Sequence, residues 1–91
     1  MPAVTEDPIE LLKQFAYFNE VYEKTEFWCV RRRKKDGAAQ AVKVTIFDAG
    51  PTTARRFHLS AKSNDGKSLA GHPQATINEA MAAVNWHELD K

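Results

Sequence analysis

Two stretches of alternating side chains limit what this chain can fold into. In residues 40–48, Val42, Val44 and Ile46 alternate with Lys43 and other side chains that point the opposite way. Residues 54–62, with the sequence ARRFHLSAK, alternate in the same manner. Because successive side chains of a β-strand point to opposite faces, both stretches predict strands with one apolar and one polar face.

A third strand is expected over residues 26–35, where aromatic and β-branched side chains give way to five consecutive cations. The Asp36-Gly37 pair that follows suits a hairpin turn, because both residues tolerate a positive backbone φ. Gly50-Pro51 marks the next turn. The three strands are therefore expected to form an antiparallel meander. Residues 67–70 are either a short fourth strand or part of a loop.

Amphipathic helices are expected on both sides of these strands. Over residues 8–24, apolar side chains recur at helical spacing, and Asp7 and Pro8 suit the N-cap and the first turn. Over residues 76–86, Thr76 and Glu79 form a capping box. Both apolar stripes have one place to be buried, the apolar face of the sheet. The predicted fold class is α+β: a single domain over residues 1–91, built as a two-layer sandwich in α-β-β-β-α order with both helices on one face.

Charge is segregated along the 91-residue chain, although its formal net charge is only +1. Residues 27–62 contain nine bases and two acids, whereas acids outnumber bases on both sides. A block of this kind is typical of proteins that bind an acidic partner. The candidate phosphate-binding residues are these nine bases: Arg31, Arg32, Arg33, Lys34, Lys35, Lys43, Arg55, Arg56 and Lys62.

Two features of this block leave alternatives open. The run Arg31–Lys35 is either a cationic finger that binds phosphates or a solvated hairpin whose charges discourage edge-to-edge pairing of strands. Trp28 either stacks on single-stranded bases from the polar face of the sheet, or anchors the core beside Val30.

The α-β-β-β-α order resembles that of the double-stranded-RNA-binding domain over most of the chain. In that family, RNA is contacted by the first helix, by the loop between the first two strands and by the start of the last helix. The resemblance implies contacts at these positions: Lys13, Gln14, Lys34, Lys35, Asp36, Gly37, Gln74 and Asn78. The lysine cluster that opens the family's last helix is absent, and so is the Gly-Pro-x-His pattern of its loop.

Other function classes find little support in the residues. The single cysteine, Cys29, excludes an intramolecular disulfide, fits a reducing cytosol and is expected to be buried. The three histidines lack the spacing of metal ligands, and no catalytic or cofactor-binding motif is visible, so neither a metal, a cofactor nor an enzymatic activity is predicted. The sequence shows no signal peptide and no apolar stretch of about 18 residues, which predicts a cytoplasmic protein without a membrane span.

The predicted function is that of a small non-enzymatic binding module. It would contact nucleic acid, RNA more than DNA, weakly and through phosphates, by its basic hairpin and the polar face of its sheet. The alternative is a protein–protein interaction module, in which the basic hairpin meets an acidic protein or serves solubility only. A homodimer is also considered, with Tyr17 and Phe18 of the first helix as contact residues.

Overall fold

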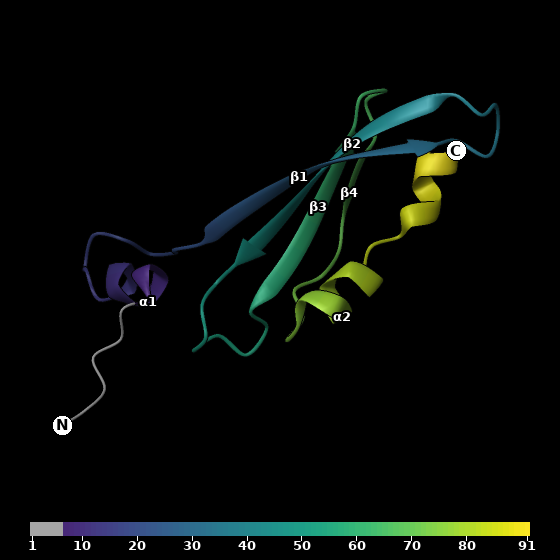
Figure 1. The fold of residues 1–91 in the computed structure, drawn as a ribbon. Coiled ribbons are helices and arrows are strands. Elements are labelled where there is room, and N and C mark those ends of the chain that lie inside the picture. The colour runs from purple at the N-terminus through teal and green to yellow at the C-terminus, as the bar shows by residue number, and fades with distance from the viewer. Residues whose placement is uncertain (1–6) are drawn as a thin grey trace.

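The computed structural model describes residues 7–91 and contains a four-stranded sheet, two short α-helices and one 3₁₀ helix (Figure 1). The elements are α1 (Pro8–Lys13), β1 (Glu23–Arg32), β2 (Ala39–Asp48), β3 (Phe57–Ser63), β4 (Ser68–Ala70), α2 (Ile77–Ala82) and the 3₁₀ helix η1 (Trp86–Asp90). The predicted α+β class and the α-β-β-β-α order are confirmed. The uncertain segment 67–70 forms the fourth strand.

The strands lie in chain order, β1-β2-β3-β4, and each pairs antiparallel with the next. Residues that lie opposite one another in neighbouring strands share a face of the sheet. Cys29, Val42 and Ser63 form one such row, and Trp28, Lys43 and Lys62 form the next one, on the opposite face. The alternation predicted for β2 and β3 is therefore observed.

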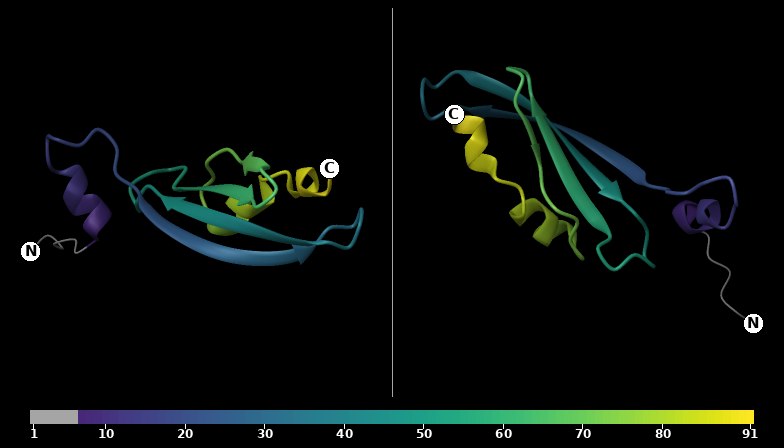
Figure 2. Two further views of the ribbon diagram at one scale, coloured as in Figure 1. Left: turned by 90° about the horizontal axis from the view of Figure 1, so that it is seen from above. Right: turned by 180° about the vertical axis from the view of Figure 1, so that it is seen from behind.

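The core lies on one face of this sheet, beneath the C-terminal part of the chain. α2 and η1 lie over this face (Figure 2). Apolar side chains of β2 and β3 pack there with apolar residues of the C-terminal segment. The buried apolar cluster consists of Val42, Val44, Ile46, Leu59, Ala61, Ala80, Val84 and Leu89. We refer to this side as the core face and to the opposite side as the open face.

The C-terminal helix is shorter than the predicted 76–86. Thr76 caps α2 as expected, because its Oγ1 accepts a hydrogen bond of 3.1 Å from the Glu79 amide. The helix ends at Ala82, and the chain then forms η1, in which Leu89 is buried in the core. The Trp86 indole donates a hydrogen bond of 2.8 Å to the Met81 carbonyl and ties η1 to α2.

The N-terminal helix departs most from its predicted range of 8–24. Asp7 caps α1 as expected, but the helix ends at Lys13. Ile9 is buried against the turn between β2 and β3, and Lys13 donates a hydrogen bond to the Ala49 carbonyl. Beyond Lys13, the predicted apolar stripe of the helix has no surface to pack against, and Phe15 is about half exposed. The helix ends early because helices in proteins depend on such packing. α1 therefore lies past the end of the sheet, whereas we expected it on the core face (Figures 1 and 2).

Two strands differ from their predicted bounds of 26–35 and 54–62. β1 begins earlier, at Glu23, and ends at Arg32, so the last three cations of the run belong to the turn. Gly37 supplies the positive φ, +68°, that this turn requires. β3 begins at Phe57 instead of residue 54, because the preceding residues form the loop between β2 and β3. In this loop the Ala49 amide donates a hydrogen bond to the Arg56 carbonyl.

Candidate functional site

The nine candidate cations do not form one surface, because a meander places consecutive turns at opposite ends of its strands. Lys34 and Lys35 lie in the β1–β2 turn, and Arg55 lies in the β2–β3 connection at the other end. β2, which joins these two ends, is ten residues long, or about 33 Å at the usual rise per residue. Lys43 and Lys62 lie between them on the open face.

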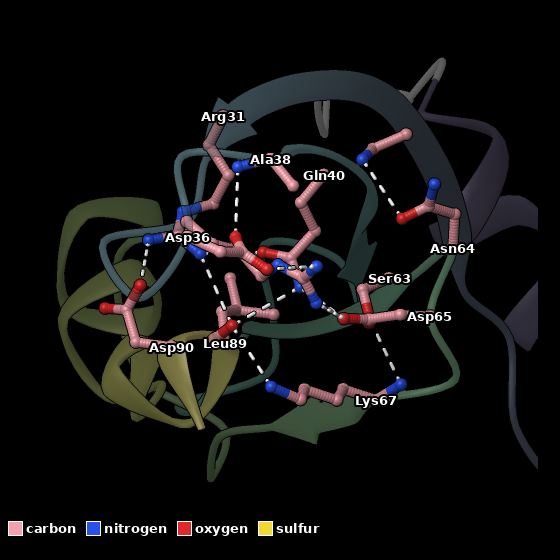
Figure 3. A network of polar contacts seen from close by, with 12 residues as sticks. Arg31, Asp36, Ala38, Gln40, Ser63, Asn64, Asp65, Lys67, Leu89 and Asp90 are labelled. Atoms are coloured by element: carbon pink, nitrogen blue, oxygen red, sulfur yellow. Dashed lines mark hydrogen bonds and ion pairs between the residues drawn. The ribbon is translucent and has the colours of Figure 1, made fainter.

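Arg31 does not point toward a solvent-facing ligand site but holds the C-terminus on the core face. Its Nη1 donates to Gln40 Oε1 at 2.6 Å, and its Nη2 forms an ion pair with Asp90 (Figure 3). The buried Gln40 side chain in turn donates to the Leu89 carbonyl at 3.3 Å, and Lys67 Nζ donates to the same carbonyl at 3.2 Å. This network fastens η1 to the sheet.

Arg33 is neutralised by two carboxylates at the same end of the molecule. Its guanidinium pairs with Asp65 at 2.9 Å and with Asp36 at 3.0 Å. The pKa of Asp65 is lowered, chiefly by a hydrogen bond from Ser63, and the pKa of Asp90 is lowered chiefly by the hydrogen bond from Arg31. Both carboxylates are therefore held in their charged form, and the arginines are engaged within the protein.

Arg56 is also paired. Its guanidinium holds Asp48 in a two-bonded contact, with Nε–Oδ1 at 2.6 Å and Nη2–Oδ2 at 2.9 Å. These hydrogen bonds lower the pKa of Asp48 and raise the pKa of Arg56. In the described part of the chain, the remaining candidates form no ion pair: Arg32, Lys34, Lys35, Lys43, Arg55 and Lys62.

The open face brings Trp28 together with two of these unpaired cations. Trp28, Lys43 and Lys62 lie opposite one another in β1, β2 and β3, so their side chains form a row across the sheet. Lys43 Nζ lies 5.9 Å from the centroid of the Trp28 ring, within the range of a cation–π contact. The row borders a shallow hollow of about 280 Å³, which Ala41 and Asn64 also line. This settles the orientation of Trp28, which is 74% exposed and lies outside the core.

A second aromatic group lies on the same face, nearer α1. The rings of Phe47 and His58 are stacked with their centroids 4.5 Å apart, and the Tyr22 ring meets both edge-on. Tyr22 lies within the range predicted for the first helix, and His58 was expected to be a polar surface residue on the polar face of the sheet. The alternation of the two strands already placed Phe47 and His58 on one face, but only the register shows that they are direct neighbours.

The core face carries an apolar groove that the helices leave open. Phe27 and Cys29 of β1 and Met81 and Trp86 of the C-terminal part are among the residues that line this groove of about 460 Å³. The prediction that Cys29 is buried is wrong: the thiol is exposed, because the buried core lies over β2 and β3 and the groove beside β1 stays open. Phe27 and Met81 are exposed by 48% and 41% for the same reason.

The regions that would contact RNA by the resemblance stated above do not come together on one surface. α1, with Lys13, and the turn with Lys34 and Lys35 lie at opposite ends of the molecule (Figure 1). The Lys13 ammonium is held by the Ala49 carbonyl and by Thr53 Oγ1 at 3.2 Å. The turn cations and the open face are therefore the regions with cations available for a ligand.

Two further searches concern the described residues only. Residues 7–91 contain no cluster of three or more side chains that could hold a metal ion. None of their helices has the length and the hydrophobicity needed to cross a membrane. Comparison of the chain with protein-family models, with curated protein sequences and with solved structures finds no match.

Proposed function

We propose that this protein is a non-enzymatic module that binds single-stranded nucleic acid on the open face of its sheet. One observation carries the proposal: Trp28, Lys43 and Lys62 form a single row across three strands, on the face that no helix covers. The row combines an exposed aromatic ring with two cations, the pair of features by which sheet surfaces hold single strands.

Trp28 supplies the stacking surface. An indole ring that is 74% exposed on an open sheet face is costly to hydrate, and a base that stacks on it removes that cost. Such stacking contributes about 1–3 kcal/mol per base and needs an unpaired base, because the bases of a duplex are already stacked on one another. This favours a single strand over a duplex.

Lys43 and Lys62 supply the charge for the phosphates. Neither lysine forms an ion pair within the described residues, so binding a phosphate breaks no ion pair of theirs. The nearest acid on this face, Glu26, is engaged by Lys24 at 3.0 Å. By contrast, the paired Arg31, Arg33 and Arg56 would have to leave their carboxylates first, and we assign them no role in binding.

The stacked rings of Phe47 and His58 offer a second contact for the same strand. Phe47 lies four residues along β2 from Lys43, a separation of about 13 Å at the usual rise of a strand. Bases further along a bound strand would meet these rings. RNA is the form that the topological resemblance favours, and the exposed thiol of Cys29 suits the reducing cytosol in which such a module would work.

The test is a fluorescence-anisotropy titration of a labelled oligouridine with the wild-type protein and matched variants. Trp28→Ala should weaken binding by about 5- to 100-fold, whereas Val30→Ala, which trims an equally exposed side chain of the same strand, should change it less than about twofold. Replacing Lys43 and Lys62 together with Ala should reduce the salt slope of log K by about 1.4, since each phosphate contact on a single strand contributes roughly 0.7. Lys24→Ala, at a lysine that is already paired, is the control for this pair.

Other ligands serve as comparisons in the same titration. Duplex RNA of equal length should bind more weakly than the oligouridine, and single-stranded DNA shows how far the 2′-hydroxyls matter. Polyglutamate carries the charge without the bases. If polyglutamate binds as tightly as the oligouridine and Trp28→Ala changes neither, the site recognises an acidic protein instead and the proposal is refuted.

A further inference from the structure

We infer that β1 is a dimerisation strand: it pairs antiparallel with β1 of a second copy of this chain, about a two-fold axis at Cys29, and joins two four-stranded sheets into one of eight strands. This inference goes beyond nucleic-acid binding and does not depend on it. It rests on the edge of the sheet, on the direction of its free amides and on the pattern of charges along it.

β1 is a long edge strand without cover. It lies at the margin of the sheet, and its ten residues match the length of β2, so it has a partner on one side only (Figure 2). Trp28 and Val30 on this strand are 74% and 77% exposed, and Phe27 is 48% exposed. A long edge of unpaired amides with exposed apolar side chains is a site where strands associate, and proteins that remain monomeric cover or shorten it.

The free amides of β1 belong to its even-numbered residues. The Arg33 amide donates to the Ala38 carbonyl at 3.0 Å. The odd-numbered residues of β1 therefore direct their backbone N–H and C=O groups toward β2. The pairing of β2 with β3 is consistent with this. The Ala41 carbonyl accepts from the Asn64 amide, so the odd-numbered residues of β2 direct their backbone groups to β3 and the even-numbered ones direct theirs to β1. Because backbone amides alternate along a strand, the even-numbered residues of β1 present their N–H and C=O groups to the outer edge: Lys24, Glu26, Trp28, Val30 and Arg32.

An axis at Cys29 gives these residues complementary partners. It places Trp28 opposite Val30 of the second copy, an aromatic residue against a β-branched one, and Glu26 opposite Arg32, an acid against a base. By symmetry each contact occurs twice, so four of the five outward-facing residues of each copy are paired within β1. The fifth, Lys24, falls opposite residue 34, which lies in the turn beyond the strand. Cross-strand pairs of both kinds stabilise antiparallel sheets.

Neighbouring registers are less favourable. An axis at Trp28 would place Lys24 opposite Arg32, and like charges directly opposite one another destabilise a sheet. An axis at Phe27 would place Glu26 opposite Trp28 and would leave Arg32 opposite residue 22, before the start of the strand. In the described part of the chain Arg32 has no ion pair of its own, and its Nη1 donates to the Gly37 carbonyl at 3.0 Å. In the dimer its guanidinium would pair with Glu26 of the second copy, whose contact within its own strand is the exposed ion pair with Lys24.

β1 of a second copy is a better partner for β1 than the other edge of the sheet, because that edge strand, β4, is too short. β4 contains only the three residues Ser68–Ala70, so a head-to-tail contact of β1 with β4 would form few hydrogen bonds and would propagate into a fibre. The β1–β1 contact is symmetric and closes after two copies. It also places the two rows of Trp28, Lys43 and Lys62 on one continuous face.

Sedimentation velocity without nucleic acid tests the inference. The wild-type protein should convert from monomer to dimer as its concentration rises. Glu26→Arg and Arg32→Glu should each raise the dissociation constant on the order of tenfold, because two attractive contacts become repulsive, and combining them should restore it to within about threefold. Lys35→Glu changes the net charge as Arg32→Glu does but lies in the turn, and it should leave the dissociation constant unchanged.

Cys29 reports the register. In the proposed pairing, Cys29 lies opposite Cys29 of the second copy at a non-hydrogen-bonded position, where Cα atoms are about 4.5 Å apart and a disulfide can form. Diamide, which removes the two thiol hydrogens and is itself reduced, should yield a covalent dimer, and Cys29→Ser should abolish the cross-link while the sedimenting dimer persists. A protein that remains monomeric, a dimer that does not cross-link, or a double charge variant that is not rescued would each overturn the inference.

Discussion

Gln40 is a polar side chain buried within the network that fastens η1 to the sheet, and it allows the contribution of this network to stability to be measured. It is 1% exposed, accepts from Arg31 Nη1 at 2.6 Å, and donates to the Leu89 carbonyl at 3.3 Å and to Asp65 Oδ2 at 3.1 Å. Gln40→Met keeps nearly the same shape and removes all three bonds. A hydrogen bond with a charged partner contributes about 2 kcal/mol, and here there are two, with Arg31 and Asp65. The neutral bond contributes about 1 kcal/mol, whereas the buried methionine regains about 1 kcal/mol.

We therefore expect Gln40→Met to lower the free energy of unfolding by about 4 kcal/mol. The melting temperature should fall by about 4–8 °C for each kcal/mol, as is usual for a domain of this size. Urea and thermal unfolding, followed by tryptophan fluorescence and circular dichroism, measure both quantities. Gln74→Met is the control, because the Gln74 contacts with Phe57 are made by its backbone, and its effect should stay below about 0.5 kcal/mol. Equal effects of the two substitutions would refute the assignment of a structural role to the network.

Two further predictions concern α1 and the response to acid. Gly50→Ala should release α1, because Gly50 has φ +95° and an added Cβ would lie 3.0 Å from Ile9 Cγ2. Hydrogen exchange should then show that the amides of α1 lose protection while those of the sheet do not. Gly37→Ala is the control, because Gly37 has open space around it and its substitution should leave α1 in place. Asp48→Asn should make the stability of the protein less sensitive to acid. In the folded protein, Arg56 holds the pKa of Asp48 below its ordinary value of 3.8. The contribution of Asp48 to stability is therefore fully present above pH 3.8 and is lost as the pH falls through the folded pKa. Urea midpoints between about pH 6 and pH 2 should therefore fall less steeply in Asp48→Asn than in the wild-type protein, and parallel curves would contradict this.

The candidate site shows what patterns along the chain can and cannot predict. Lys43 and Lys62 follow from alternation alone, since β2 and β3 each have one clear apolar side. The orientation of Trp28 does not follow, because Phe27, Trp28 and Val30 are all apolar and each could face the core. The register decides it: Cys29 lies opposite Val42, so Trp28 must share the open face with Lys43.

The basic run was the least predictable feature, because its partners are distant in the sequence. Arg31 pairs with Asp90 and Arg33 pairs with Asp65, and both contacts require the C-terminal half of the chain to return to the first hairpin. A count of charges along the chain includes these arginines as if they formed no ion pairs within the protein. Their pairing removes them from the surface that could bind a polyanion.

Local chemistry determined the parts of this protein whose cause lies within a few residues: the two-sided strands, the caps at Asp7 and Thr76, and the glycine turn after the cations. Tertiary structure alone decided that the N-terminal helix stops at Lys13, that β1 is left as an uncovered edge and that a tryptophan and two lysines share one face. The physical reason is that a short helix persists only where its apolar side is packed, and a side chain's neighbours are set by strand register, which pairs residues far apart in the chain.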